Sequence, residues 1–303
     1  MGAKLLKSTK LKSTWTLHLM LFLPVVLLVI FCYTPMVGIV VAFQDYLPTK
    51  GFFGSKWVGL QYFNFLFSIK DTWNVIRNTL VISVGKIVVG LSVSVVFAIL
   101  LNEININSLK KSIQTFVFFP YFLSWVILGS ILVDILSLDG AFNSLIKALG
   151  MKPVMFLANN TTFVPVIVLS NTWKDFGYNM IIFYAAIMNI DPTLYEAATV
   201  DGAGRLRQTW NITLPSMAPI VAVVGLLSLG GVLNAGFDQI FNMYNPLVMR
   251  TGDILDTYIY RLGLMSGQYA FATAAGLLKS LVGFVLIIIA YRAADRFANY
   301  RIL

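Results

Sequence analysis

From Ser13 to Gln44 the chain reads STWTLHLMLFLPVVLLVIFCYTPMVGIVVAFQ, without a single Asp, Glu, Lys or Arg. Roughly 20 apolar residues in a helix cross the hydrocarbon core of a bilayer, so this run is long enough to span a membrane. It is longer than the apolar region of a signal peptide, about 7–15 residues, and it lacks a small-residue cleavage site. We therefore expect a retained first membrane helix over residues 15–43, kinked by Pro24 and Pro35.

The composition extends this conclusion to the whole chain of 303 residues. Hydrophobic residues make up 58% and charged residues 12%, with a mean hydropathy of +0.81, whereas about 25% of the residues of a soluble domain are charged. A soluble globular protein is therefore excluded. Further apolar runs predict membrane helices over residues 73–101, 113–136, 163–188, 212–236 and 269–291. The expected fold is an all-α integral membrane bundle of six helices, forming one domain over 1–303 with its core spans in 73–292.

The basic residues indicate membrane orientation, not a nucleic-acid partner. The formal net charge is +9, but the 22 Lys and Arg residues are scattered between apolar runs and form no long basic face. Residues 1–14 form a basic N-terminus, and basic residues are densest in this segment and in the loops that alternation places on its side of the membrane. The positive-inside rule then predicts a multi-pass protein with both termini in the cytoplasm.

Catalytic and metal-dependent functions find no support in the residue types. The chain has one cysteine, Cys32, and one histidine, His18, so it has neither a disulfide framework nor a His/Cys cluster that could bind a metal. No pair of carboxylates recurs at a spacing that favours hydrolysis. We therefore expect no catalytic residue, no metal site and no cofactor in this chain.

One loop carries a specific pattern, between the fourth and fifth predicted spans. Asp191 is a good N-cap and Pro192 a good first residue for a helix. This helix is expected to end near Val200, because Gly202 and Gly204 permit the positive φ that turns the chain. A second helix should then enter the membrane. The pattern predicts a small helix-turn-helix at the membrane surface.

This loop resembles the EAA loop of ABC importer permeases at seven signature positions. They are Glu196-Ala197-Ala198, Gly202, Ile212 and Leu214-Pro215. The resemblance implies a cytoplasmic coupling loop over 190–215, between spans 4 and 5, whose short helix docks into a groove on an ATPase subunit. The residues expected to couple the chain to that ATPase are Glu196, Ala197, Ala198, Asp201, Gly202 and Ala203.

Weaker similarities point to the carbohydrate-uptake branch of type I importers. They comprise Trp57-Val-Gly-Leu-Gln-Tyr-Phe63, Arg77-Asn-Thr-Leu80, Trp173 with Gly177, and Asp201-Gly-Ala203 with Gln208, Trp210 and Pro219. Membership would imply a bacterial inner membrane location, a second permease subunit, most simply a different chain, two cytoplasmic ATPase subunits and an extracytoplasmic substrate-binding protein. Gly85-Lys86 is followed by Ile87 and is not a Walker A motif. ATP and Mg would therefore be bound by the ATPase partners.

Polar residues at membrane depth are candidates for the substrate path. Lys86, Lys174 and Lys279 fall near the middle of three spans, where each charge costs about 2.5–3.5 kcal/mol. If they face one cavity, its positive charge would favour an acidic ligand such as a uronate-containing oligosaccharide. Alternatively, Lys174 pairs locally, Lys86 and Lys279 snorkel or bond backbone carbonyls at helix contacts, and none touches the substrate. The further candidates, chosen by depth and by their ability to bind sugars, are Trp173, Asp175, Tyr178, Asn179, Asn234 and Asp238.

The sequence thus predicts a permease subunit of an ATP-driven sugar importer, with an oligosaccharide as solute. Two other functions stay open. The chain could be an ABC importer permease for a non-sugar solute such as phosphate or an amino acid. More distantly, it could be an ATP-independent secondary carrier, which would place ionisable coupling residues at a broken helix.

Overall fold

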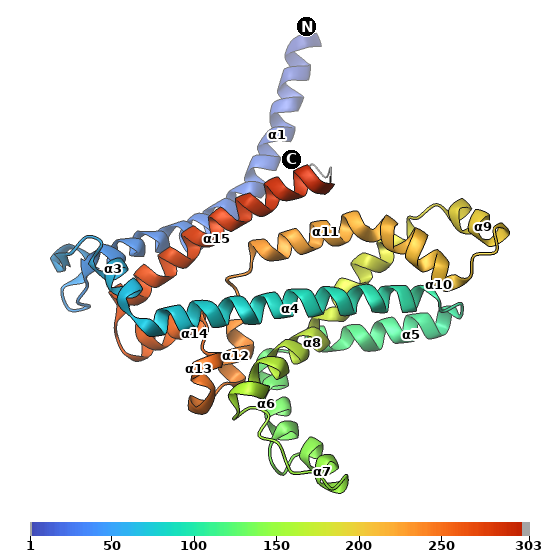
Figure 1. The fold of residues 1–303 in the computed structure, drawn as a ribbon. Coiled ribbons are helices and arrows are strands. Elements are labelled where there is room, and N and C mark those ends of the chain that lie inside the picture. Colours follow the sequence, from blue (N-terminus) through green and yellow to red (C-terminus); the bar gives the residue numbers. More distant parts are fainter. Residues whose placement is uncertain (1, 299–303) are drawn as a thin grey trace.

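The computed structural model describes the fold of residues 2–298 and the side chains of residues 14–296. Within these residues the chain is mostly helical, and its only sheet is the short antiparallel pair of β1 (Gln44–Asp45) and β2 (Lys56–Trp57). Figure 1 shows the long helices lying side by side in one bundle. The all-α expectation is confirmed.

Four long helices form this bundle: α4 (Lys70–Asn102), α8 (Asn160–Met188), α11 (Leu214–Gly230) and α15 (Tyr269–Ala298). Helix α4 packs along α8, α11 packs along α15, and α4 and α8 both contact α11. One end of the bundle carries α9 (Pro192–Val200) and α10 (Arg205–Gln208), and the opposite end carries α13 (Met249–Gly252) and α14 (Leu255–Tyr260). We call these the α9 end and the α13 end.

Three apolar clusters follow α4 from the α13 end to the α9 end. Val75 belongs to the first, Ile82 to the second and Ala98 to the third, and each cluster joins α4 to other elements of the bundle. Because lipid tails are as apolar as these side chains, burial alone gives little driving force for helix association in a membrane. Close packing and polar contacts between helices must therefore fix their arrangement.

Five helical stretches are long and apolar enough to cross a membrane, counted among the described residues. They are Thr14–Phe43, Lys70–Asn102, Trp125–Ala148, Arg205–Gly230 and Tyr269–Arg296. Helix α8 has 29 residues and covers the predicted span 163–188, but its middle contains Asn171, Lys174, Asp175 and Asn179. This helix lies inside the bundle, between α4, α5 (Asn107–Phe118) and α11, so it need not be apolar.

Two of the predicted spans are broken. The third, expected as one helix over 113–136, consists of α5, the 3-10 turn η3 (Phe119–Phe122) and α6 (Trp125–Leu136). Pro120 within η3 has no N–H to continue the helix. The fifth, expected to reach 236, ends with α11 at Gly230, and α12 (Phe237–Met243) follows after an irregular segment. At its start Gly236 has φ +93°, which favours glycine.

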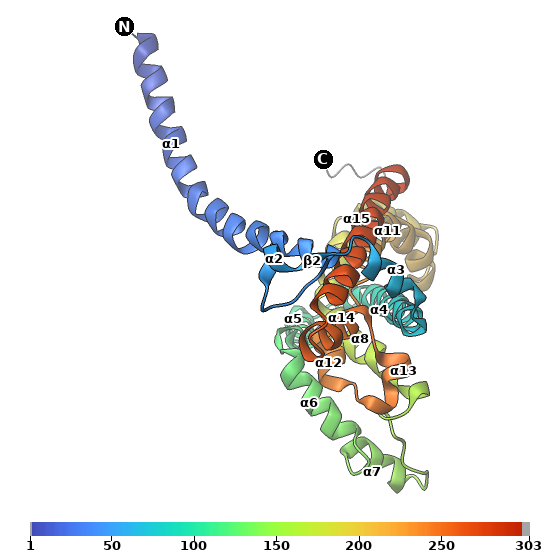
Figure 2. The ribbon, with the colours of Figure 1, turned by 90° about the vertical axis from the view of Figure 1, so that its left-hand side faces the viewer.

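Two parts of the chain stand away from the bundle. Helix α1 (Gly2–Leu28) diverges from it, and the path then turns through η1 (Val29–Tyr33) into η2 (Thr34–Phe43), which lies along α15 (Figures 1 and 2). Helix α6 and the following α7 (Ala141–Ala148) project from another side (Figure 2). Large apolar side chains on both parts, such as Phe22 and Val126, are exposed. Lipid or another protein must cover them.

Four further short elements lie at the α13 end and before α4. They are α2 (Gly51–Gly54), α3 (Gln61–Ser68), η5 (Pro246–Val248) and η6 (Arg261–Met265). Aromatic residues make the contacts that fix the segment between β1 and α4. Trp57 stacks on Phe43 with centroids 5.9 Å apart, and Tyr62 donates a hydrogen bond of 3.0 Å to Asp45.

Candidate functional site

A polar cavity of about 270 Å³ lies between α4, α8, α11 and the break that follows α11. Its lining residues are Ser83, Lys86, Ile87, Gly90, Leu91, Asn171, Thr172, Asp175, Phe176, Asn179, Ser228, Gly231, Asn234, Ala235 and Gly236. Irregular backbone at membrane depth is tolerated where it is buried in protein or lines a cavity. The break of the fifth span meets this condition, because its residues form one wall of the cavity.

Lys86 joins the cavity wall to the break. Its ammonium donates to the backbone oxygen of Ala235 at 2.6 Å and to Gln239 Oε1 at 2.5 Å. Gln239 is fully buried, and its amide donates to Ile167 O at 2.8 Å and to Ser170 Oγ at 2.9 Å, both on α8. One hydrogen-bonded network therefore connects α4, α12 and α8.

The carboxylate of Asp175 lies in the same cavity and accepts a hydrogen bond of 3.0 Å from Asn171. Together with Asn179 and Asn234 it provides the donors and acceptors that a hydroxyl-rich ligand needs. Of these four residues, only Asn171 is absent from the candidates that the sequence provides. The other candidates do not line this cavity: Asp238 is exposed on α12, Trp173 is exposed on α8, and Tyr178 stacks on Tyr121 with centroids 4.8 Å apart.

The three intramembrane lysines occupy separate places. Lys174 is buried and donates to the backbone oxygen of Tyr121 at 2.7 Å, with its ammonium over the rings of Tyr121 and Trp125. Lys279 forms an ion pair of 2.5 Å with Asp256. Among the described residues, only Lys86 of the three lines the polar cavity. Lys86 thus bonds a backbone carbonyl and Lys174 has a local partner, Asp175 at 4.0 Å, as in the second alternative, whereas Lys279 forms an ion pair instead of snorkelling or bonding a carbonyl. The three charges do not share one cavity.

At the α9 end, helix α9 begins and ends where the sequence predicts. The Asp191 side chain accepts a hydrogen bond of 2.9 Å from the backbone N–H of Thr193, which lowers the pKa of the Asp191 carboxyl. Gly202 has φ +76°, as expected, and lies after the last turn of α9. Gly204 has φ −70°, so the expected positive φ is needed at Gly202 alone. This difference arises because Gly204 is the N-cap of α10.

The surface of this helix-turn-helix is open. Glu196, Ala197, Asp201 and Gly202 are exposed, and Ala198 and Ala203 are half-buried. Apolar side chains around them are also uncovered, among them Val200 (88% exposed), Leu206 (79%) and Trp210 (70%). A protruding helix with small residues and uncovered apolar neighbours is suited to docking against another protein.

Two polar contacts attach α9 and α10 to the bundle, and a third joins these two helices to each other. The hydroxyls of Tyr195 and Thr213 are 2.9 Å apart, which links α9 to the start of the fifth span, where η4 (Thr209–Thr213) leads into α11. Gln208 donates to Thr199 Oγ1 at 3.0 Å, and Arg205 forms an ion pair of 3.0 Å with Glu103 beyond the end of α4. Glu103 and Arg205 are 102 residues apart, so no local sequence signal predicts this pairing.

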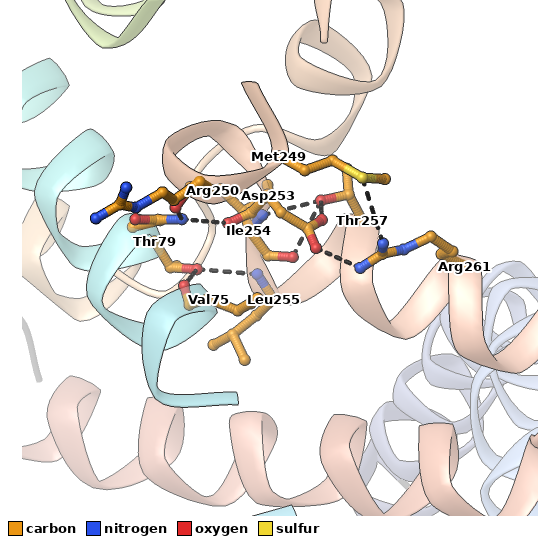
Figure 3. A network of polar contacts seen from close by, with 10 residues as sticks. Val75, Thr79, Met249, Arg250, Asp253, Ile254, Leu255, Thr257 and Arg261 are labelled. Carbon is orange, nitrogen blue, oxygen red and sulfur yellow. Dashed lines mark hydrogen bonds and ion pairs between the residues drawn. The ribbon is translucent and has the colours of Figure 1, made fainter. Parts of the chain in front are cut away.

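A second buried network ties α4 to the α13 end (Figure 3). Asn78 donates to the backbone oxygens of Arg250 and Asp253, at 3.0 and 3.1 Å. Thr79 Oγ1 accepts from the N–H of Leu255 at 2.9 Å. The Asp253 carboxylate pairs with Arg261, and its other oxygen accepts from Thr257 Oγ1. The pair Asn78-Thr79, part of the resemblance described above, thus holds the loop between α13 and α14.

Comparisons with known proteins agree with this architecture. Residues 90–299 match the family model described as "Binding-protein-dependent transport system inner membrane component". The chain is 41% identical, over 93% of its length and 88% of the relative's, to the polygalacturonan/rhamnogalacturonan transport system permease protein YteP of Bacillus subtilis (strain 168). Protein LplB of the same strain is 40% identical over 95% of this chain and 91% of its own.

Solved structures give the same result. A subunit of a bacterial ABC transporter involved in the import of the acidic polysaccharide alginate is 36% identical, with a TM-score of 0.86 over 95% of this chain and 98% of that chain. In a second structure, of a bacterial alginate ABC transporter in complex with an alginate pentasaccharide-bound periplasmic protein, the TM-score is 0.87 over 97% and 99%, with 35% identity. The chain therefore belongs to the family of inner membrane components of binding-protein-dependent transport systems.

Proposed function

We propose that this permease serves an ATP-driven importer whose solute is an oligosaccharide of an acidic polysaccharide. The observation that carries the proposal is the likeness, over nearly the whole chain, to permeases named for polygalacturonan/rhamnogalacturonan and for alginate. Polygalacturonan and alginate both consist of uronate sugars, whose hydroxyl and carboxylate groups require a polar path. The cavity beside the fifth-span break offers amide, carboxylate and backbone groups for such a ligand.

A complete transporter needs partners that this chain does not contain. A second permease would close the other side of the translocation path and cover exposed apolar faces such as that of α6. Two ATPase subunits in the cytoplasm would bind ATP and Mg, and a substrate-binding protein would deliver the solute from outside. In this arrangement the α9 end faces the cytoplasm, as do both termini, and the α13 end faces the binding protein.

The contacts at the α9 end offer a route from ATPase to cavity. Docking would involve Glu196, Ala197, Ala198, Asp201, Gly202 and Ala203, the exposed or half-exposed residues of the helix and its turn. Movement of α9 would pass through the Tyr195–Thr213 contact into η4 and α11. Helix α11 continues to Gly230, beside the cavity. Closure of the ATPases would thereby open the cavity outward, and their separation would return it to the cytoplasmic side.

Reconstitution tests this function. The chain, purified from its native membrane with the proteins that accompany it, is placed in liposomes with a substrate-binding protein from the same organism, and uptake of labelled trigalacturonate is measured with and without ATP. We expect uptake that needs both ATP and the binding protein. A complex that is stimulated by phosphate or an amino acid instead would assign a non-sugar solute. Uptake driven by an ion gradient without an ATPase would contradict the importer and favour a secondary carrier.

A further inference from the structure

Two membrane lysines bond to the breaks in the third and fifth spans described above. Lys86, on the unbroken helix α4, donates to the carbonyl of Ala235 in the break between α11 and α12. Lys174, on the unbroken helix α8, donates to the carbonyl of Tyr121 in the break between α5 and α6. Both donors come from the middle of a continuous helix, and both acceptors are main-chain oxygens of the interrupted helix beside it.

These carbonyls need such donors because of where they lie. Ala235 precedes Gly236, the N-cap of α12, so its oxygen lies outside the hydrogen-bond ladder of that helix. Tyr121 lies in η3, before α6 begins at Trp125. A backbone oxygen left unpaired in the low-dielectric interior of a membrane costs several kcal/mol. An ammonium group has three donors and no acceptor, so it suits clustered acceptors at a break.

The break in the fifth span provides both space and an acceptor for the ammonium group of Lys86. A Cβ atom at Gly236 would lie 2.9 Å from Lys86 Nζ, so glycine leaves the space that the ammonium occupies. Gln239 presents Oε1 to the same ammonium, while its amide nitrogen is fixed on α8. The orientation of α12 is thereby tied at once to α4 and to α8.

We propose that Lys86 is a positioning residue that, through Gln239 and Ala235, holds α12 in place at the cavity, and that it does not read the charge of the solute. The proposal rests on the proposed function, since it says how the cavity of that importer is built. The charge of Lys86 is engaged by the break and is accompanied in the cavity by the carboxylate of Asp175. Neutralising Lys86 should therefore slow transport of charged and neutral sugars alike.

A double-mutant cycle on the purified complex tests the contact between Lys86 and Gln239 without any substrate. The variants are Lys86→Met, Gln239→Leu and the double variant, and the readout is the melting temperature in detergent. Each single change should lower it by several degrees. The double variant should lose less than the sum of the two single losses, because both single changes already break the contact between Lys86 and Gln239. Additive losses would overturn the proposal.

A matched lysine supplies the control. Lys174→Met removes an ammonium group from the break in the third span, which Gln239 does not contact. The fall in melting temperature caused by Lys174→Met should therefore add to the fall caused by Gln239→Leu. If Lys86→Met prevents assembly, Gln239→Glu and Gln239→Leu are compared. Both lose the amide donor to Ile167 and Ser170, but only glutamate keeps an acceptor for Lys86. The glutamate variant should melt higher, and equal melting would overturn the proposal.

Transport then separates positioning from charge recognition. Uptake of trigalacturonate and of its neutral methyl ester is measured for wild type and Lys86→Met. We expect both rates to fall by the same factor, with unchanged half-saturating concentrations. A selective loss of the acidic sugar would overturn the proposal. If the wild type carries neither sugar, the solute assignment fails, while the melting cycle still decides the role of Lys86.

Discussion

Gly177, in the middle of α8, is a position where even a methyl side chain should destabilise the fold. A Cβ atom there would overlap the backbone oxygen of Val117 and lie 3.1 Å from Phe118 Cα, both on α5. Backbone atoms cannot move aside as the end of a flexible side chain can. Gly177→Ala must therefore push α5 away from α8, next to the break of the third span.

The size of the effect follows from two opposing terms. Replacing glycine by alanine within a helix gains at most about 1 kcal/mol in helix propensity, while overpacking costs about 1–3 kcal/mol and occasionally more. We expect a net loss of roughly 1–2 kcal/mol for Gly177→Ala. At Gly283, in α15, a Cβ atom would meet no heavy atom of this chain within 4 Å apart from the adjoining backbone of its own helix. Gly283→Ala should therefore leave stability unchanged or raise it slightly.

The assay is the melting temperature of the purified complex, followed by the loss of its monodisperse peak in size-exclusion chromatography. Gly177→Ala should melt several degrees below wild type and below Gly283→Ala. If Gly177→Ala has the same melting temperature as wild type, α5 and α8 do not pack as closely as the structure shows. The contact beside the break of the third span would then be wrong.

Three further outcomes test contacts at the two ends of the bundle. Glu103→Arg should lower ATPase stimulation modestly, because an exposed ion pair contributes at most about 1 kcal/mol, and adding Arg205→Glu should restore it; a swap that stays as impaired as the single variant refutes the pairing. Asn78→Leu should cost about 2 kcal/mol or more in a thermal melt, since two carbonyls lose their buried donor. Asp191→Asn should keep the α9 cap and Asp191→Ala lose it, as measured by the amount of ATPase retained. The hydrogen bond from Thr193 lowers the pKa of the Asp191 carboxyl in the folded protein. The stabilisation by the charged carboxylate is therefore fully present above about pH 4, the unfolded value, and is lost as the pH falls through the lower native pKa. An NMR titration of the Asp191 carboxyl carbon would show this lowered pKa.

Helix α9 could be predicted from sequence because its signals are local. An N-cap, a proline at the first turn and a glycine after the last turn each act within a few residues, and α9 follows them from Pro192 to Val200. The membrane spans were predictable for the same reason, since a long apolar run needs no partner to be recognised. The expectation for Gly204 is wrong because glycine is also acceptable as an N-cap, which is its role before α10.

The breaks and the lysine contacts depend on residues distant in sequence. Pro120 marks a weak point in the third span, but nothing nearby shows that α8 supplies Lys174 to the freed carbonyl. Gln239 gives no signal at all, although it is the buried centre of the network around Lys86. Hydropathy alone also underrates α8, whose polar middle is explained only by the helices that surround it.

Whether the turn after α9 serves an ATPase can be decided by one co-purification from the native membrane. Gly202 and Gly150 share φ +76°, and beyond their own chain neighbours no heavy atom lies within 4 Å of the place a Cβ would take, so valine imposes the same local strain at both. Gly202 lies at the proposed docking surface, whereas Gly150 follows α7 far from it (Figure 1). We predict that wild type and Gly150→Val retain an ATPase and a second permease, and that Gly202→Val loses the ATPase. Retention of the ATPase by all three proteins, or by none, would contradict docking through this turn.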